Sequence, residues 1–373
     1  MPLDPATEAR VFAKLVRRGL LEQADVAELF AAARAAGEAG EPVSLSSLAL
    51  RRGLLDKSSL SRLLRTDGED VPPIPGRAYV AKLGEGGTAH VFKVRDKDGD
   101  EQAVKILKSE VAADPAEVKA FLAEAKLLQR LDHENVVKGD QVGRLAGRYL
   151  FFMEHVDGRT LQECIEQDGA FEEESALSII LQVSRALEYL RGEGVVHRDV
   201  KPGNIMVTAD DTVKLIDLGF ALGNAGAGEQ AAGTTRGTAA YLSPEQARGE
   251  ADLDVRSDIY SLGATLYQMV LGELPFAGED DEELVQQAVL AGLSAEATKG
   301  GRISAHMHYF IEKMMAKDRD VRYQSPEQLQ ADIVRQMQGK QSLAGPADDD
   351  GADDDDLARR RLDRMRRKRK RKR

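Results

Sequence analysis

The sequence is poor in cysteine and in long apolar segments. Cys164 is the single cysteine among 373 residues, which excludes a framework of intramolecular disulfides and favours a reducing compartment. No stretch reaches the roughly 18 consecutive apolar residues that a membrane-spanning helix needs. The first residues, MPLDPATEARVF, lack the basic and then apolar pattern of a secretory signal. We therefore expect a cytoplasmic protein.

Charge is plentiful and unevenly distributed. Residues 348–356 carry seven aspartates, whereas residues 357–373 carry twelve Lys and Arg against one acid. Such runs cannot form a core, so we expect residues 339–373 to be a disordered, acidic-then-basic tail. The basic part, residues 359–373, has two interpretations. It only aids solubility, or it contacts a polyanion such as anionic lipid or nucleic acid, which would place the protein at the membrane or nucleoid periphery.

Residues 1–65 have the pattern of a small all-helical module with an internal repeat. The sequence RRGLLE at 17–22 returns as RRGLLD at 51–56, and apolar residues flank both copies at helical spacing. Two copies are fewer than the three that stacked helical repeats need. We therefore predict two helix–turn–helix units in one small bundle. Docking of another protein, or dimerisation, is favoured over binding of a nucleotide signal.

The pattern changes after the module. The sequence TDGEDVPPIPG, residues 66–76, combines acids with three prolines and predicts a linker. Short β-type runs then follow from Tyr79, namely AYVAKL, HVFKV and QAVKIL, separated by a glycine-rich turn and by RDKDGD. Beyond residue 158 the pattern is mostly helical. A β-rich part before a helical part predicts an α+β fold with two lobes.

The segment VVHRDVKPGNIMV, residues 195–207, indicates the chemistry. His197-Arg198-Asp199, followed by Lys201 and Asn204, matches the pattern H-R-D-x-x-x-x-N. Four further sequences match other motifs that occur together with this one, and they stand in the expected order along the chain. They are Lys105 in EQAVKIL, Glu124 in FLAEAKLL, Asp217-Leu218-Gly219 at the D-F-G position and Ser243-Pro244-Glu245 at the A-P-E position. Across residues 79–335 the chain therefore resembles the bacterial eukaryotic-like Ser/Thr protein kinases of the protein kinase superfamily.

This resemblance implies a two-lobed protein-kinase fold over residues 77–338, with a β-rich N-lobe and an α-helical C-lobe, preceded by the helical module. It also implies transfer of the γ-phosphoryl group of ATP to Ser or Thr hydroxyls of protein substrates, with Mg²⁺ as cofactor. Such a transition state spreads charge over phosphate oxygens, so positioning and electrostatics dominate catalysis.

The resemblance assigns catalytic roles to four residues. Asp199 would accept or orient the hydroxyl proton of the substrate, and Lys201 would neutralise the transferring phosphate. Lys105 would pair with the α- and β-phosphates and would itself be held by Glu124.

Two further groups of residues are assigned to ligands. Asn204 and Asp217 would hold Mg²⁺. The nucleotide would be bound by backbone groups of the glycine-rich turn, by apolar side chains around adenine and by the hinge residues Glu154 and Val156. Met153, which precedes the hinge, would be the gatekeeper. These residues are Gly84, Glu85, Gly86, Gly87, Thr88, Val91, Ala103, Lys105, Met153, Glu154, Val156 and Met206.

Supporting residues follow from the same resemblance. Arg198 would pair with a phosphate on Thr234 or Thr235, the candidate autophosphorylation sites, and Thr238 would bond to Asp199. We further expect a structural ion pair and a brace for the catalytic loop. The pair is Glu245 with Arg322, and the brace is Asp258.

Four positions depart from the family pattern: Ala89 replaces the third glycine of G-x-G-x-x-G, Leu218 the phenylalanine of D-F-G, Ala239 the proline of G-T-P, and Ser243 the alanine of A-P-E. We expect the backbone of the tight turn to need glycine at Gly84, Gly86 and Gly87, which are intact. We expect Ala89 to stiffen the turn slightly and to weaken ATP binding without abolishing it. The alternative function is a pseudokinase scaffold that displays docking surfaces. Such scaffolds usually lack a catalytic residue, whereas here the whole set is present.

Overall fold

The computed structural model describes residues 5–17, 19–69, 71–219, 238–276, 278, 280–290 and 302–339. The chain divides into two compact units. Unit 1 comprises residues 1–118 and 140–155, and unit 2 comprises residues 119–139 and 156–373. None of the described helices has the length and hydropathy of a membrane-spanning segment.

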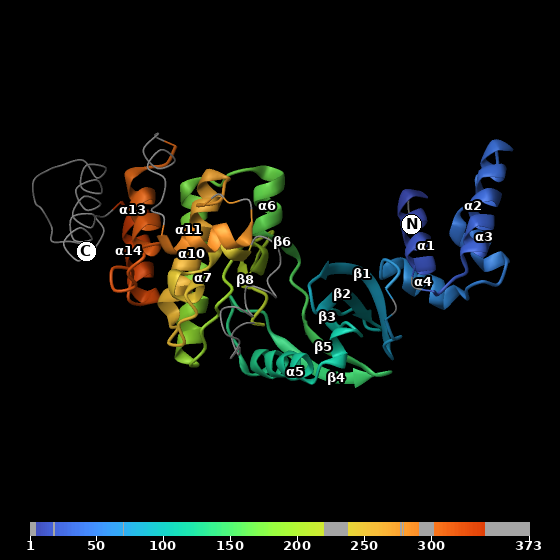
Figure 1. The fold of residues 1–373 in the computed structure, drawn as a ribbon, viewed down its shortest axis with the longest axis horizontal. Helices are drawn as coiled ribbons and strands as arrows, with labels where there is room; N and C mark the ends of the chain where they lie inside the picture. Colours follow the sequence, from blue (N-terminus) through green and yellow to red (C-terminus); the bar gives the residue numbers. More distant parts are fainter. Residues whose placement is uncertain are drawn as a thin grey trace, which may run out of the picture. The chain divides into compact units, whose positions relative to one another are not determined.

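Unit 1 begins with the predicted helical module (Figure 1). Side chains from its helices share one core, in which Val11, Phe12, Leu15, Leu29 and Ala49 are fully buried. Ser44 caps the third helix and Asp56 caps the fourth, each through a side-chain oxygen that accepts backbone N–H groups. The helices are α1 (Pro5–Arg17), α2 (Gln23–Glu38), α3 (Leu45–Arg51) and α4 (Lys57–Arg65).

The two copies of the repeat turn in the same way. Gly19 and Gly53, at equivalent positions of the repeat, have φ values of +67° and +69°. This left-handed conformation ends a helix without the steric cost that a side chain would bring. Gly19 and Gly53 therefore each lie at the corner of a helix–turn–helix unit.

The rest of unit 1 is a five-stranded antiparallel sheet with the strand order β1-β2-β3-β5-β4. Cross-strand pairing separates its residues between two faces. Phe92, Val104 and Phe152 pair across three strands and belong to one apolar cluster with Val71 and Ile74, two residues of the segment predicted as a linker. The strands are β1 (Arg77–Glu85), β2 (Ala89–Asp96), β3 (Glu101–Leu107), β4 (Gly139–Leu145) and β5 (Arg148–Glu154).

Unit 2 is mostly helical. Its central helix, α10 (Val255–Leu271), is buried along almost its whole length, which its apolar composition explains. Gly263 lets this helix approach α13 (Ala305–Met314) closely, because a Cβ there would lie 2.7 Å from Met314 Cβ. The other helices are α5 (Pro115–Arg130), which begins in unit 1, α6 (Leu161–Asp168), α7 (Glu173–Gly192), α9 (Pro244–Ala247), α11 (Asp281–Leu290) and α14 (Pro326–Met337).

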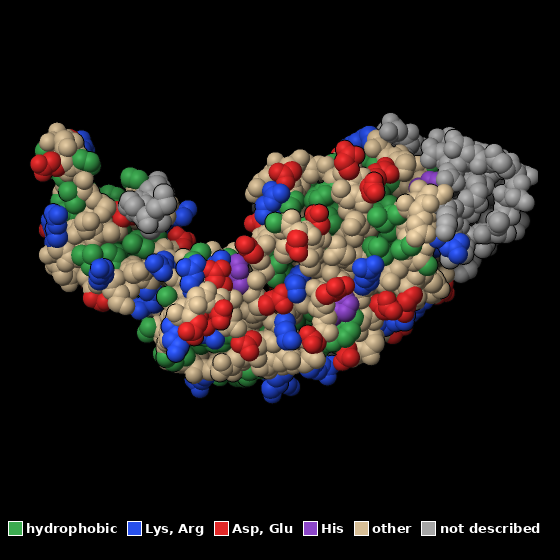
Figure 2. Space-filling view, turned by 180° about the vertical axis from the view of Figure 1, so that it is seen from behind, with side chains coloured by type: hydrophobic (Ala, Val, Ile, Leu, Met, Phe, Trp, Pro, Cys, Tyr) green, Lys and Arg blue, Asp and Glu red, His purple; other side chains and the backbone are tan. Residues whose placement is uncertain are grey.

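A small sheet in unit 2 includes the end of the predicted catalytic segment, residues 195–207. Its order is β6 (Gly158–Thr160), β7 (Ile205–Thr208) and β8 (Val213–Leu215), all antiparallel. The α+β fold predicted from the sequence is thus confirmed, with a β-rich lobe, a helical lobe and helices ahead of both. Acidic and basic side chains of the described residues intermix on the face shown in Figure 2.

Candidate active site

The predicted catalytic loop lies between the end of α7 at Gly192 and the start of β7 at Ile205, and it brings three predicted site residues into direct contact. The Asp199 carboxylate is buried, and its Oδ2 lies 2.8 Å from Lys201 Nζ. The amide nitrogen of Asn204 donates to the same oxygen at 2.7 Å and to the Asp199 carbonyl at 2.8 Å. A short 3₁₀ turn, Pro202–Asn204, returns the chain so that this amide faces Asp199. The site therefore pairs one carboxylate with one cation and one fixed amide.

Burial sets the protonation behaviour of this loop. It raises the pKa of Asp199 to about 6, although the ammonium of Lys201 opposes the rise. Burial also lowers the pKa of His197 to about 4, so its imidazole is neutral at pH 7. In keeping with this, His197 Nδ1 accepts the backbone N–H of Asp199 at 3.2 Å. A carboxylate with a pKa near neutrality suits proton transfer at cellular pH.

Asp258 on α10 holds the backbone of the loop. Its two carboxylate oxygens accept the N–H groups of His197 at 2.9 Å and of Arg198 at 2.7 Å. Arg198 has φ of +68°, a conformation that costs a residue with a side chain of order 1–3 kcal/mol. Burial raises the pKa of Asp258 to about 7, while the two N–H donors favour its ionised form. The brace expected of Asp258 is thus present in the hydrogen bonding.

A residue that the sequence analysis did not select completes this support. The side-chain amide of Gln246 donates to the Arg198 carbonyl at 2.8 Å. Gln246 is fixed by Ser243, since the two residues form a reciprocal capping box at the start of α9. The pattern S-x-x-Q at positions 243–246 is the signal that could have pointed to it.

The two predicted cation ligands lie on neighbouring strand ends. The Asn204 carbonyl accepts the N–H of Ile216 at 3.1 Å, which places Asp217 beside the catalytic loop. Both hydrogen bonds of the Asn204 amide use Nδ2, so the side-chain oxygen is the atom that remains for a cation. A carboxylate and an amide oxygen are ligands that Mg²⁺ accepts, so these residues fit the ion.

Gly219 is the close neighbour of Asp217. Its N–H donates to Asp217 Oδ1 at 2.9 Å. A Cβ at this position would lie 3.1 Å from that oxygen and 3.6 Å from Glu124 Oε2. Because Gly219 has no side chain, it leaves room for two carboxylates. Glu124, which is buried on α5, therefore lies close to the turn that carries Asp217.

Four of the residues predicted to bind the nucleotide lie on one face of the sheet in unit 1. Val91 pairs with Lys105, and Ala103 pairs with Met153, so these four side chains lie opposite the apolar cluster that contains Phe92. Glu154 ends β5 in the same sheet, whereas Val156 and Met206 belong to unit 2.

The glycine-rich turn joins β1 to β2, and its conformation differs from our expectation. Gly84, Gly86 and Gly87 all lack a positive φ, and a Cβ on any of them would find no atom closer than 3.8 Å. The turn therefore does not need glycine for its backbone conformation. The three glycines instead leave the backbone of the turn without side chains, so that a ligand can approach its N–H groups. Ala89 also has no positive φ and is paired with Leu107 in the sheet, so an alanine fits this position without backbone strain.

The expected ion pair between Glu245 and Arg322 is present and buried. Arg322 Nη1 and Nη2 contact the two Glu245 oxygens at 2.5 and 2.8 Å, a two-pronged geometry. Burial alone would raise the pKa of Glu245, but the hydrogen bonds and charge of Arg322 outweigh it and lower that pKa. Thr234, Thr235 and the basic tail lie outside the described residues, as does the side chain of Thr238.

Comparison with known proteins agrees with this geometry. The family model for the protein kinase domain matches residues 78–334. The serine/threonine-protein kinase PknB of Mycobacterium tuberculosis is 36% identical over 265 residues, which cover 69% of this chain and 42% of that protein. The probable serine/threonine-protein kinase SCO3848 of Streptomyces coelicolor is 35% identical over 266 residues, covering 69% and 39%. The chain thus spans about two fifths of the length of these relatives.

Proposed function

The chain belongs to the protein kinase family, and on that premise we propose that it transfers the γ-phosphoryl group of ATP to serine or threonine hydroxyls of protein substrates. The observation that carries the proposal is the cluster of Asp199, Lys201 and Asn204, in which one carboxylate oxygen contacts both partners within 2.8 Å. This arrangement places a proton acceptor beside a fixed positive charge, as transfer of a phosphoryl group to a hydroxyl requires.

The residues divide the work as follows. Asp199 orients the substrate hydroxyl and takes its proton, and its raised pKa makes it a competent base near pH 7. Lys201 contacts the carboxylate at 2.8 Å and presents its charge to the phosphoryl group during transfer. Asp258 and Gln246 hold the loop backbone, so that the geometry is fixed before substrate arrives.

Asn204 and Asp217 are the residues that would hold Mg²⁺, through the amide oxygen and the carboxylate. When bound, Mg²⁺ neutralises negative charge on the phosphates. Lys105 would contact the phosphates from the sheet face that it shares with Val91 and Ala103. The backbone of Gly86 and Gly87 is exposed, and Gly84 likewise has no side chain, which supports close approach of the triphosphate.

The competing function, a pseudokinase scaffold, lacks a supporting observation. Lys105, Glu124, Asp199, Asn204 and Asp217 are all present. We test activity by Mg²⁺-dependent transfer of labelled γ-phosphate to a general protein substrate and to the chain itself. We expect the wild type to transfer phosphate, and Asp217→Asn and Lys105→Met to lose at least about a hundredfold. Lys138→Met, which removes a surface lysine paired with Asp132, is the matched control and should keep its rate. Equal rates in all four proteins would contradict the proposal.

We extend the proposal to autophosphorylation of Thr234 or Thr235. A phosphate there would give the Arg198 guanidinium a doubly charged partner. Mass spectrometry of the protein after incubation with ATP should place phosphate on one of the two threonines. Its absence from both, in an active preparation, would contradict this part.

Two contacts with other molecules belong to the same proposal. Residues 1–65 would dock another protein, and the basic residues 359–373 would contact anionic lipid or nucleic acid. Co-sedimentation with anionic vesicles, and separately with duplex DNA, should weaken when residues 357–373 are removed. Identical binding of the shortened protein would contradict the tail contact.

A further inference from the structure

Glu69 is a buried acid that lies ahead of the kinase family match, which begins at residue 78. Its side chain is 2% exposed. Burying a carboxylate is costly unless positive or hydrogen-bonding groups compensate for the lost water. The partners of Glu69 therefore show which groups stabilise a buried acid at this position.

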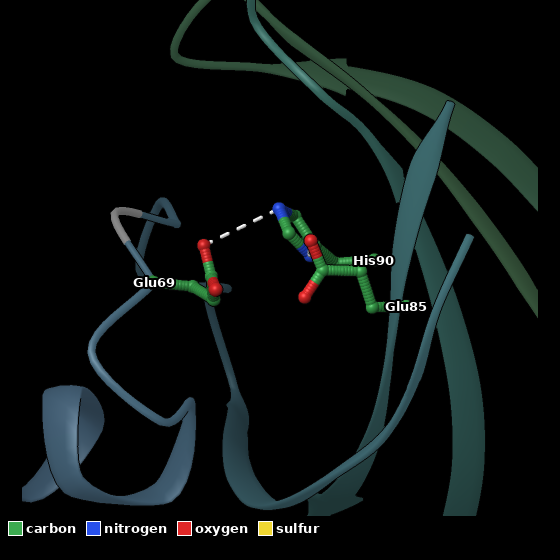
Figure 3. Close-up of side chains that lie close together, drawn as sticks. All are labelled: Glu69, Glu85 and His90. Carbon is green, nitrogen blue, oxygen red and sulfur yellow. Dashed lines mark ion pairs between the residues drawn. The ribbon is translucent and has the colours of Figure 1, made fainter. Parts of the chain in front are cut away.

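The partners of Glu69 lie on the strands that flank the glycine-rich turn. Lys82 Nζ on β1 contacts Glu69 Oε1 at 3.1 Å, and His90 Nε2 on β2 lies 3.3 Å from Glu69 Oε2. Figure 3 shows Glu69 reaching from the loop before β1 toward His90, with Glu85 on the other side of the imidazole. Glu69 thus contacts one residue before the turn and one residue after it.

Lys82 connects Glu69 to the turn itself. The same ammonium contacts Glu85 Oε2 at 2.7 Å, and the other oxygen of Glu85 contacts Lys108 at 3.0 Å. Lys108 also binds the far end of the turn, because its backbone N–H donates to the Thr88 carbonyl at 2.9 Å. The hydrogen bonds from Lys82 and Lys108 lower the pKa of Glu85 to about 2, so this acid is ionised at neutral pH.

The position of Glu69 is set by the end of the helical module. Thr66, the residue that follows α4, accepts the Glu69 N–H at its carbonyl, and its hydroxyl donates to the Glu69 carbonyl. Gly68 donates to Leu63 on α4 at 2.7 Å, and Asp67 pairs with Lys14 on α1. A continuous set of contacts therefore runs from α1 and α4 through Glu69 to the glycine-rich turn.

A divalent cation is a poor occupant of this cluster. Ligand atoms of Glu69, Glu85 and His90 do lie within 4.8 Å of one another. However, Lys82 and Lys108 already neutralise the two carboxylates, and both ammonium groups would repel the ion. The charges balance within the protein, which favours a structural role for the cluster.

We propose that Glu69 is a positioning residue for the glycine-rich turn, through which the segment ahead of the kinase domain sets the affinity for ATP. The proposal rests on the kinase function proposed above. By holding Lys82, Glu69 fixes the ion pair that Glu85 makes at the base of the turn. A turn that is ordered before ATP arrives loses less conformational freedom on binding, and the affinity is correspondingly higher.

The test compares three full-length variants with the wild type. Glu69→Gln keeps the shape and removes the charge, and Glu69→Asp keeps the charge on a shorter side chain. Glu101→Gln is the charge control, because Glu101 pairs with Lys93 and Arg95 in the same sheet without touching the turn, and its contact with His155 is long, at 3.9 Å. We expect the Kd for Mg·ATP, measured by calorimetry, to rise about three- to tenfold in Glu69→Gln and less in Glu69→Asp. It should stay unchanged in Glu101→Gln, and kcat should stay within about twofold in every variant.

Amide hydrogen exchange separates this proposal from the kinase function itself. Without nucleotide, the amide of Gly86, which donates to Ala89 at 2.9 Å, should exchange faster in Glu69→Gln than in Glu101→Gln. A wild type that binds no ATP would refute the kinase function, whereas the exchange result would still decide the role of Glu69. Unchanged exchange together with unchanged Kd in Glu69→Gln would overturn the proposal. So would a Zn²⁺-dependent rise in Tm that His90→Ala abolishes, since it would assign the cluster to a metal.

Discussion

Asp258 accepts the backbone N–H of Arg198 at 2.7 Å, and Arg198 is one of four residues other than glycine, among those that the structure describes, with a positive φ. The carboxylate and the strained backbone belong together, because the second oxygen of Asp258 also holds His197. The orientation of the neighbouring Asp199 therefore depends on a side chain from α10.

The first prediction concerns this brace. In Asp258→Asn, one of the two N–H donors loses its acceptor, which costs about 1–3 kcal/mol in the free energy of unfolding. Because the loss occurs in the catalytic loop, kcat should fall at least about tenfold. Asp332→Asn removes a buried carboxylate from the same unit, where it accepts the Tyr323 hydroxyl at 2.7 Å. Urea unfolding and steady-state kinetics should show destabilisation in both variants and a specific loss of kcat only in Asp258→Asn.

The second prediction concerns pH. In its proposed role Asp199 must be ionised to accept a proton, and burial raises its pKa to about 6. Activity should therefore be constant above about pH 7 and fall about tenfold per pH unit well below 6. Lys201 opposes the raised pKa, so in Lys201→Met the acid limb should move to higher pH. Profiles of kcat/KM between pH 5 and 9 test this, and an acid limb that moves to lower pH would contradict it.

The third prediction contrasts a buried with an exposed ion pair. Arg322→Met leaves Glu245 buried without its main partner and should cost about 3–5 kcal/mol in the free energy of unfolding. Arg319→Met removes a pair whose acid, Asp252, is 72% exposed, so solvent screens it and the loss of stability should be much smaller. Urea unfolding measures both. If the two variants lost similar amounts of the free energy of unfolding, burial would not make the pair of Glu245 and Arg322 more important for stability than an exposed pair.

The fourth prediction concerns Gly219. In Gly219→Ala the new methyl group would lie 3.1 Å from Asp217 Oδ1, so this carboxylate must shift. We expect the rate of phosphotransfer to fall at least about tenfold. The Mg²⁺ concentration that gives half-maximal activity should rise. Gly192→Ala is the control, because its Cβ would find open space at the end of α7. A rate for Gly219→Ala that equals the control would show that the carboxylate tolerates the shift.

The fifth prediction concerns the missing third glycine. Ala89 is buried in β2 and has an ordinary φ, so Ala89→Gly should destabilise the protein by about 0.5–1 kcal/mol. The KM for ATP should change less than about threefold, because the turn itself is untouched. A change from an inactive to an active enzyme would show that this methyl group controls the turn.

Short-range patterns in the sequence predicted much of this molecule. The order of the strands and helices followed from periodicity, and the residues around Asp199 followed from a spacing of a few positions. The cluster of Asp199, Lys201 and Asn204 is local, because a single turn of chain brings the three together. Such contacts depend little on the rest of the fold.

Contacts between distant residues could not be predicted in this way. Gln246 reaches Arg198 across 48 positions, and Glu69 reaches Lys82 and His90 only because α4 ends where it does. The glycine-rich turn illustrates another limit. Its glycines suggested a backbone that only glycine adopts, whereas the structure gives them ordinary φ values. Sequence shows where side chains are missing, but it does not show whether the backbone or a ligand requires their absence.

The packing of Val71 and Ile74 against Phe92 and Phe152 has a consequence for the order of folding during synthesis. The ribosome releases the chain from its N-terminus, so the helical module and residues 66–76 emerge before the strands that they cover. Val71 and Ile74 are therefore available to pack on the apolar face of the sheet while the sheet forms. A protein that started at residue 78 would complete this sheet with that face in water, and such exposed apolar strands favour aggregation.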